Sequence, residues 1–266
     1  MPFLSSARKP YVIGAGVVAA AALLGAVSYT ATKPDAPTAS AARTPGGGES
    51  APGAEPRVYP ELERYARRDA EDGLALGRAD APVVLIEYAD FKCGYCGKFA
   101  RDTEPELIRR YVDRGVLRIE WRNFPIFGAD SERAARAAWA AGQQGRFWQF
   151  HRAAYAEGAK EKGFSAERVA ALAREAGVPD LGRFTRELDG EAARKAVAKD
   201  QDQGYSLGAT STPSFLVNGR PLAGAQPTEA FAKAIEASAA AAKQRPESVT
   251  PSETAGAGAR DERADR

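Results

Sequence analysis

The chain has 266 residues, of which 44% are hydrophobic and 27% are charged, and this composition is typical of a globular protein rather than of a disordered one. Its 37 Lys and Arg residues and 35 Asp and Glu residues leave a net charge of +2, which argues against nucleic acid as a partner. Two cysteines and one histidine exclude a disulfide-dense secreted scaffold and a metal site of the Cys/His type.

The N-terminal segment predicts export from the cytoplasm. Two basic residues, Arg8 and Lys9, precede an uncharged run, Val12–Tyr29, which as a helix spans about 27 Å, barely the thickness of a bilayer core. We interpret residues 1–10 as a cytoplasmic N-terminus and residues 11–31 as a transmembrane anchor, with a cleaved secretory signal as the alternative. The rest of the chain is then extracytoplasmic, in a single-pass membrane protein or, after cleavage, in a secreted one.

Two further segments lack the composition of a folded domain. Residues 32–58 are rich in Pro, Ala, Gly and Ser, and they predict a flexible linker. Residues 243–266 contain one large apolar residue, Val249, and they predict a disordered tail. Residues 59–242 remain as a single domain.

This domain begins with a strand, a helical stretch and a second strand. Residues 82–88 form a short apolar, β-branched run, and residues 116–121 alternate between apolar and polar. The stretch between them is helical to about residue 114, and Gly115 ends it. Thr103 and Pro105 look like a fresh helix N-terminus inside that stretch, so we expect a kink or restart there. The pattern predicts a right-handed βαβ unit.

The second half of the domain is helical and then returns to the sheet. Asn218 and Gly219 predict a tight hairpin turn between two short strands. The whole pattern predicts an α/β fold in which a helical block, about residues 130–208, separates the βαβ unit from a ββα unit. The predicted helices are 131–144, 147–156, 165–176, 190–207 and 228–241, and the predicted strands are 214–217 and 221–222.

Cys93 and Cys96 lie where the first strand meets the helix. A disulfide that closes so short a loop adds only about 2 kcal/mol of stability, and a metal site needs two further ligands. We therefore interpret the pair as redox-active. The free N–H groups and the dipole of a helix N-terminus stabilise a thiolate, so we expect Cys93 to be the nucleophile and Cys96 to resolve the mixed disulfide.

Four segments resemble the DsbA-like thioredoxin family: EYADFKCGYC (87–96), FWQFH (147–151), TPSFLVNG (212–219) and GAQP (224–227). The resemblance covers about residues 70–240. It implies a thioredoxin-like fold with an inserted helical subdomain, and the N-terminal transmembrane helix predicted above precedes this fold. It also implies a thiol:disulfide oxidoreductase that acts on exported proteins, with no cofactor beyond its own disulfide and with a membrane quinone-linked reoxidant or a membrane reductant as its redox partner.

The same resemblance assigns roles around the dithiol. Glu87 stands at the position of a buried acid that accepts the proton of Cys96; the alternative is a salt-bridged strand carboxylate. Thr212 and Pro213 stand at the position of the threonine and cis-proline that face the dithiol and shape the peptide-binding edge; an ordinary strand-entry proline is the alternative. Gly94 and Tyr95, between the cysteines, are expected to contact the substrate.

The chain departs from the strongly oxidising family members at this pair. Those members have Pro-His between the cysteines, whereas Gly94 and Tyr95 resemble the pair in the DsbC isomerases. The direction of exchange therefore stays open between a disulfide-forming enzyme, which we place first, and a reductase or isomerase. A tethered peptide-binding chaperone is a third possibility. His151, the single histidine, is interpreted as a packed, hydrogen-bonded helix residue.

Overall fold

The computed structural model describes residues 57–244. The predicted cytoplasmic N-terminus and membrane anchor lie outside these residues, as do nearly all of the predicted linker (32–58) and tail (243–266). Within residues 57–244, none of the helices is both long enough and apolar enough to cross a membrane.

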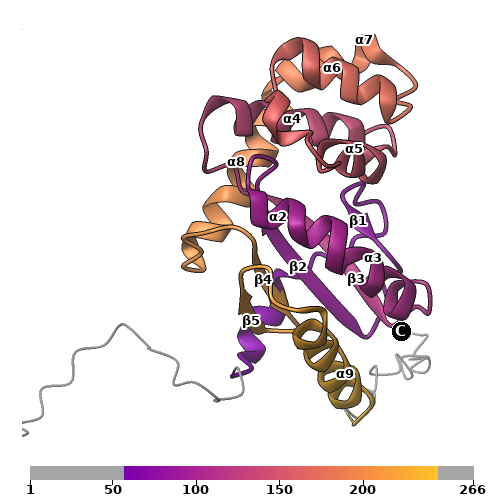
Figure 1. Cartoon of the computed structure of the whole chain (residues 1–266). Helices are drawn as coiled ribbons and strands as arrows, with labels where there is room; N and C mark the ends of the chain where they lie inside the picture. The colour runs from indigo at the N-terminus through magenta and orange to yellow at the C-terminus, as the bar shows by residue number, and fades with distance from the viewer. Residues whose placement is uncertain (1–56, 245–266) are drawn as a thin grey trace, which may run out of the picture. The chain divides into compact units, whose positions relative to one another are not determined.

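A five-stranded mixed sheet forms the centre of this part of the chain (Figure 1). The strand order is β1-β3-β2-β4-β5; β2 and β3 run parallel, and the other neighbouring strands run antiparallel. The two-residue strand β1 was not predicted. The strands are β1 (Ala75–Leu76), β2 (Val83–Ala89), β3 (Leu117–Asn123), β4 (Ser214–Val217) and β5 (Arg220–Ala223).

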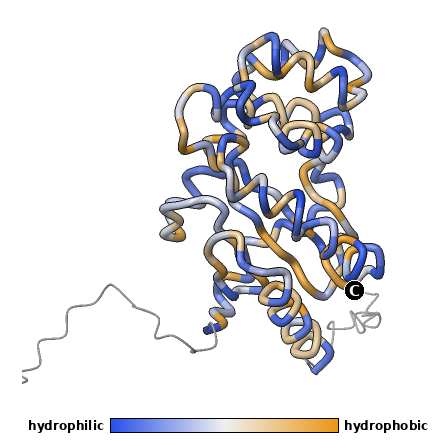
Figure 2. Tube along the Cα trace, viewed as in Figure 1, coloured by the Kyte–Doolittle hydropathy of each residue, from blue (hydrophilic) through white to orange (hydrophobic). Residues whose placement is uncertain are grey.

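The central strands β2 and β3 are buried along their whole length. The apolar sequence of β2, which Figure 2 shows in the hydrophobic colour, predicts this, whereas β3 alternates between apolar and polar residues and is buried all the same. Side chains alternate between the two faces of a strand. Leu85 belongs to the larger apolar cluster, which also contains both cysteines, whereas Ile86 and Tyr88 belong to a smaller cluster. Glu87 has the same parity as Leu85, so its carboxyl group points to the face that carries the cysteines.

The connection between β2 and β3 is helical from Gly94 to Val112, but it is not one regular α-helix. Two short α-helices, α2 (Gly94–Lys98) and α3 (Glu104–Leu107), alternate with π-helical turns, η2 (Phe99–Thr103) and η3 (Ile108–Val112). Pro105 lies in the first turn of α3, and the restart predicted there is confirmed. Thr103 occupies the N-cap position, but its side chain makes no capping hydrogen bond.

A helical block lies between β3 and β4, as predicted. The structure adds one helix that is absent from the predicted set, α7, which follows Gly177 and Pro179. Asp180 caps this helix by accepting a hydrogen bond from the N–H of Arg183. The block contains α4 (Ala129–Gly142), α5 (Phe147–Ala154), η4 (Lys160–Lys162), α6 (Ala166–Glu175), α7 (Leu181–Asp189) and α8 (Glu191–Ser206).

The C-terminal part returns to the sheet and covers one of its faces. Asn218 and Gly219 have positive φ angles of 41° and 76°, which the predicted tight turn requires. The last helix, α9 (Thr228–Gln244), buries Phe231 against Phe99 and Phe215, with ring centroids 5.1 and 4.9 Å apart. A short 3-10 helix, η1 (Pro60–Tyr65), precedes the sheet.

A buried ion network lies on β3. Glu120 is fully buried and lies 3.0 Å from Arg118 Nε and 2.7 Å from Arg122 Nη2. Its two oxygens also accept hydrogen bonds from the backbone N–H groups of Arg67 and Arg68. The charge is therefore fully paired, as a carboxylate in an apolar interior must be.

Candidate active site

Cys93 and Cys96 lie just after β2, where the chain enters α2. Cys93 is the N-cap residue, and its Sγ accepts a hydrogen bond from the N–H of Cys96 over 3.4 Å. Its thiol also donates to the carbonyl oxygen of Thr212 over 3.2 Å. Both cysteines are free thiols, 5% of Cys93 is exposed and Cys96 is fully buried, so a second molecule reaches Cys93 first.

The two thiols differ strongly in acidity. A hydrogen bond from the Cys96 side chain, supported by the Thr212 hydroxyl and the N–H groups of Cys96 and Tyr95, lowers the pKa of Cys93 to about 6 against the opposing effect of burial. Burial, together with the hydrogen bond to Cys93 and its charge, raises the pKa of Cys96 well above its usual value. At neutral pH, Cys93 is the thiolate and Cys96 keeps its proton.

Thr212 and Pro213 face the dithiol, and the peptide bond between them is cis, as the resemblance implied. The carbonyl of Thr212 accepts the hydrogen bond from Cys93. The hydroxyl oxygen of Thr212 is buried and has no hydrogen-bond partner within residues 57–244. Because this hydroxyl is not otherwise engaged, it can donate to Cys93 once the thiol ionises, which accounts for its effect on the pKa.

Gly94 and Tyr95 lie on the open side of the site. Both are exposed, Tyr95 by 69%. A Cβ atom at Gly94 would lie 3.3 Å from the Nζ atom of Lys160, so the glycine leaves room for that ammonium group beside the cysteine loop. A cavity of about 200 Å³ adjoins Cys93 here, and Phe91, Gly97, Arg101, Tyr155 and Lys160 are among its lining residues.

Glu87 lies in the middle of β2 and is fully buried. Neither of its carboxyl oxygens has a hydrogen-bond partner in the described part of the chain, so the alternative of a salt-bridged carboxylate is wrong. Burial raises its pKa well above the usual value, and the charges of Glu104 and Cys93 raise it further. A carboxyl group of this kind takes up or releases a proton more readily near neutral pH than an ordinary glutamate does.

Sequence reasoning missed the residue that holds the cysteine loop in place. Asp90 is buried, and its carboxylate accepts hydrogen bonds from the N–H of Lys92 (2.8 Å), the Ser131 hydroxyl (2.7 Å), and the N–H groups of Ile126 (2.7 Å) and Phe127 (3.2 Å). The signal in the sequence was an aspartate at the end of a strand, where the chain enters a loop. An aspartate at such a place often forms an Asx turn, in which its carboxylate accepts a hydrogen bond from the N–H two residues later.

It also missed a second buried acid. Glu104 of α3 is 3% exposed, and its Oε2 lies 3.7 Å from Nδ1 of His151. His151 packs among aromatic rings, including Trp121 (5.2 Å between ring centroids) and Tyr155 (4.9 Å). The predicted packing of His151 is confirmed, but the predicted hydrogen bonding is wrong, because neither ring nitrogen has a partner among residues 57–244.

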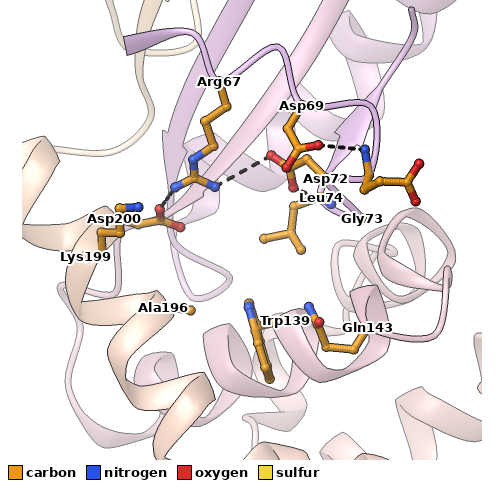
Figure 3. A pocket seen from close by; sticks show the side chains of 11 residues that line it. Arg67, Asp69, Asp72, Gly73, Leu74, Trp139, Gln143, Ala196, Lys199 and Asp200 are labelled. Atoms are coloured by element: carbon orange, nitrogen blue, oxygen red, sulfur yellow. Dashed lines mark hydrogen bonds and ion pairs between the residues drawn. The ribbon is translucent and has the colours of Figure 1, made fainter. Parts of the chain in front are cut away.

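A second cavity, of about 280 Å³, contains neither cysteine (Figure 3). Charged groups of both signs line it, and Arg67 pairs there with Asp200 and, over 3.6 Å, with Asp72. Figure 3 shows Trp139 of α4 and Lys199 of α8 at its other sides. Arg67, Asp72 and Asp200 are thus engaged with one another, and the cavity lies apart from the dithiol.

Comparison with known proteins gives the family. A family model described as thioredoxin matches residues 69–237. The chain is 32% identical over 151 residues to the probable disulfide bond formation protein D of Bacillus cereus, covering 54% of this chain and 69% of that protein. It is 35% identical over 173 residues to the Na(+)/H(+) antiporter NhaA 3 of Salinispora tropica, covering 64% of this chain but only 25% of the antiporter.

Solved structures agree with the fold. The oxidised BdbD structure from Bacillus subtilis superimposes with a TM-score of 0.59 at 23% identity, over 65% of this chain and 95% of that one. The α-DsbA1 structure from Wolbachia pipientis gives a TM-score of 0.56 at 20% identity, over 64% and 92%. Taken with the free dithiol at the helix N-cap and the cis-proline loop that faces it, these matches show that the chain belongs to the thioredoxin family, among its DsbA-like thiol:disulfide oxidoreductases.

Proposed function

We propose that the protein exchanges disulfides with exported proteins through Cys93 and Cys96, on the extracytoplasmic side of the membrane, and that it mainly forms disulfides in them. The observation that carries the proposal is the inequality of the two thiols: the pKa of Cys93 falls to about 6 while that of Cys96 rises. The name of the Bacillus cereus relative, a probable disulfide bond formation protein, supports the same direction.

The reaction has two steps. A client thiolate attacks Cys93 Sγ of the disulfide, the Cys93–Cys96 bond breaks, and Cys96 leaves with the electron pair and takes a proton from Glu87. A second client thiolate then attacks the client sulfur of the mixed disulfide, and Cys93 leaves as a thiolate. The client gains one disulfide and loses two electrons, which the Cys93–Cys96 pair holds as thiolate and thiol.

The stabilised thiolate favours this direction. A pKa of about 6 in place of 9.0 makes the reduced form about tenfold more favourable at pH 7 than a dithiol with an ordinary nucleophile. A more stable reduced form makes the disulfide a stronger oxidant. Regenerating the disulfide requires an electron acceptor, for which we propose a membrane quinone-linked oxidase.

Substrate contact is proposed for the exposed edge of the site. Gly94 and Tyr95 lie beside Cys93, and the loop of Thr212 and Pro213 faces it from the other side. An extended client segment can lie against the backbone of this loop, as peptides do at other exposed strand edges.

The test is oxidation of a reduced, unfolded client by the disulfide form of the protein, followed by the client's regained activity. Cys93→Ala is expected to abolish oxidation. A reduction potential near that of DsbA, about −120 mV, supports disulfide formation, whereas one near that of thioredoxin, about −270 mV, favours the reductase or isomerase alternative. Suppression of client aggregation by Cys93→Ala at the wild-type level, without any thiol exchange by the wild type, would instead indicate a peptide-binding chaperone.

A further inference from the structure

Three buried ionisable side chains lie on the cysteine side of the sheet, and the reaction above uses only one of them. Glu87 comes from β2, Glu104 from α3 and His151 from α5, and their exposed fractions are 0%, 3% and 0%. Both oxygens of Glu87, Oε1 of Glu104 and both nitrogens of His151 have no hydrogen-bond partner within residues 57–244. Folded proteins rarely leave so many buried polar atoms unpaired, so this cluster calls for a functional explanation.

One short distance and the charges of the side chains connect the three groups. Glu104 Oε2 lies 3.7 Å from His151 Nδ1, which a small side-chain rotation shortens to a hydrogen bond. The charge of Glu104 acts on Glu87, and the charge of Glu87 acts on Cys96. Cys96, Glu87 and Glu104 therefore influence one another through their charges, and His151 lies beside Glu104.

Burial keeps Glu104 and His151 uncharged. It raises the pKa of Glu104 to about 8 and lowers that of His151 to about 3, so both are neutral at pH 7. The charge of Arg152, an exposed residue on α5, lowers both pKa values but does not overcome the burial of Glu104. Helix α9 also packs against α3, and there the Thr228 hydroxyl donates a hydrogen bond to the Thr103 hydroxyl, which precedes Glu104.

We propose that Glu104 is a positioning residue for disulfide exchange: as a carboxylic acid that keeps its proton and donates a hydrogen bond to His151 Nδ1 once the 3.7 Å between them closes, it leaves Glu87 as the one carboxyl group that ionises next to Cys96. This inference rests on the proposed function. Two neighbouring carboxyl groups in an apolar site do not both ionise, because like charges repel strongly there. A neutral Glu104 thus permits the Glu87 anion, and an ionised Glu104 holds Glu87 in its protonated form.

The step that depends on this arrangement is the resolution of a mixed disulfide by Cys96. The Cys96 S–H bond breaks and its proton passes to the Glu87 carboxylate. The Cys96 sulfur attacks Cys93 Sγ, the bond from Cys93 to the foreign sulfur breaks, and that sulfur leaves with the electron pair as a thiolate. Glu104 keeps its proton throughout. Once Glu104 ionises, Glu87 is already protonated and accepts nothing, so resolution is impaired above about pH 8.

The probe is Ellman's disulfide, mixed with the full-length reduced protein in a stopped-flow instrument between pH 6 and 9. Attack by Cys93 releases the first nitrothiolate in a phase whose rate depends on the probe concentration. Attack by Cys96 on the mixed disulfide releases the second in a phase whose rate does not. For the wild type, we expect the logarithm of the second rate to rise with pH and to level off near pH 8.

The variant Glu104→Gln is neutral at every pH and similar in shape to the carboxylic acid. We expect its second phase to match the wild type within about twofold at pH 7 and to keep rising above pH 8, reaching a severalfold higher rate at pH 9. His151→Phe keeps a ring but removes the acceptor of the Glu104 proton, so the levelling is expected at lower pH. Glu106→Gln, on the same helix, changes a carboxylate that pairs with Arg109 at the surface, and it should leave both phases unchanged.

Two results would overturn the inference. One is a Glu104→Gln profile that superimposes on the wild type above pH 8 while the first phase is normal. The other is a tenfold slower second phase in Glu104→Gln at pH 7, which would make Glu104 itself the proton acceptor. If Glu104→Gln does not fold, carbon-13 NMR titration of the wild-type glutamate carboxyl groups decides, since a Glu104 midpoint below pH 6 contradicts the inference. Absence of the first phase in the wild type would instead refute the proposed function.

Discussion

The thiolate of Cys93 should stabilise the reduced fold in a pH-dependent way, and Cys93→Ser isolates this effect. Serine keeps the N-cap position and a hydrogen-bonding side chain, but it does not ionise between pH 5 and 9. The pKa of the thiol is about 6 in the folded protein and 9.0 in the ordinary thiol. Because the folded value is the lower one, the stabilisation is complete above pH 9 and is lost as pH falls through 6.

The size of the effect follows from the two values. Where the thiol is fully ionised in both the folded and the unfolded protein, its lower pKa in the folded protein stabilises the fold by about 4 kcal/mol. At pH 7 the same shift stabilises the fold by about 1.4 kcal/mol. Water reaches the sulfur at the mouth of the site, so screening makes both numbers upper bounds. We expect the free energy of unfolding of the reduced wild type to exceed that of Cys93→Ser by about 1 kcal/mol more at pH 7 than at pH 5.5.

The assay is urea unfolding of both proteins in excess phosphine reductant at pH 5.5, 7 and 8.5. Fluorescence of the three tryptophans, among them the buried Trp121, reports the transition. The difference between the free energies of unfolding of the two proteins at each pH cancels the contribution of the other titrating groups, as far as these groups do not depend on Cys93. A difference that stays constant from pH 5.5 to 8.5 would refute the assignment of a stabilised thiolate.

Three further substitutions test how the fold supports the site. Asp90→Ala removes the acceptor of four hydrogen bonds, one within the cysteine loop and three that join it to residues 126–131, and a loss of at least about 3 kcal/mol in urea unfolding is expected; a loss below 1 kcal/mol would contradict the role given to this residue. Glu120→Gln leaves two buried arginines without their charge partner, so the thermal midpoint should fall by an amount equivalent to about 3–5 kcal/mol. Unchanged melting would show that the arginines find other partners. Gly204→Ala places a Cβ atom 2.8 Å from the ring of Phe124, and calorimetry should record a loss of about 1–3 kcal/mol; a more stable variant would mean that the ring moves freely.

The parts of the fold that the sequence predicted have local signals. The hairpin at Asn218 and Gly219 follows from the positive φ angles that these two residue types tolerate. The end of the crossover helix follows from Gly115, which has a φ of 71°. Helix α7 lacked such a signal. Gly177 and Pro179 end the preceding helix, and Asp180 alone, the N-cap residue of α7, is too weak a signal to predict a new helix.

The candidate site divides in the same way. The cysteine pair and the Thr212–Pro213 bond could be found from motifs, whereas the burial of Glu104 could not. In a regular α-helix, a residue eight positions after Cys96 points about 80° away from it. The π-helical turn between them has more residues per turn, and it rotates Glu104 onto the buried face. A helical wheel drawn from the sequence assumes the regular geometry and therefore misses this acid.

The segment just before Cys93 is also hydrogen-bonded to the helical insertion at two points. The Tyr155 hydroxyl donates to the backbone oxygen of Asp90 over 2.9 Å, and the Ser131 hydroxyl donates to its carboxylate. The cysteine loop therefore cannot open locally unless α4 and the end of α5 give way as well. Hydrogen exchange at the amide of Lys92 should then need the same large-scale opening as the sheet, which makes the dithiol and the insertion one cooperative unfolding unit.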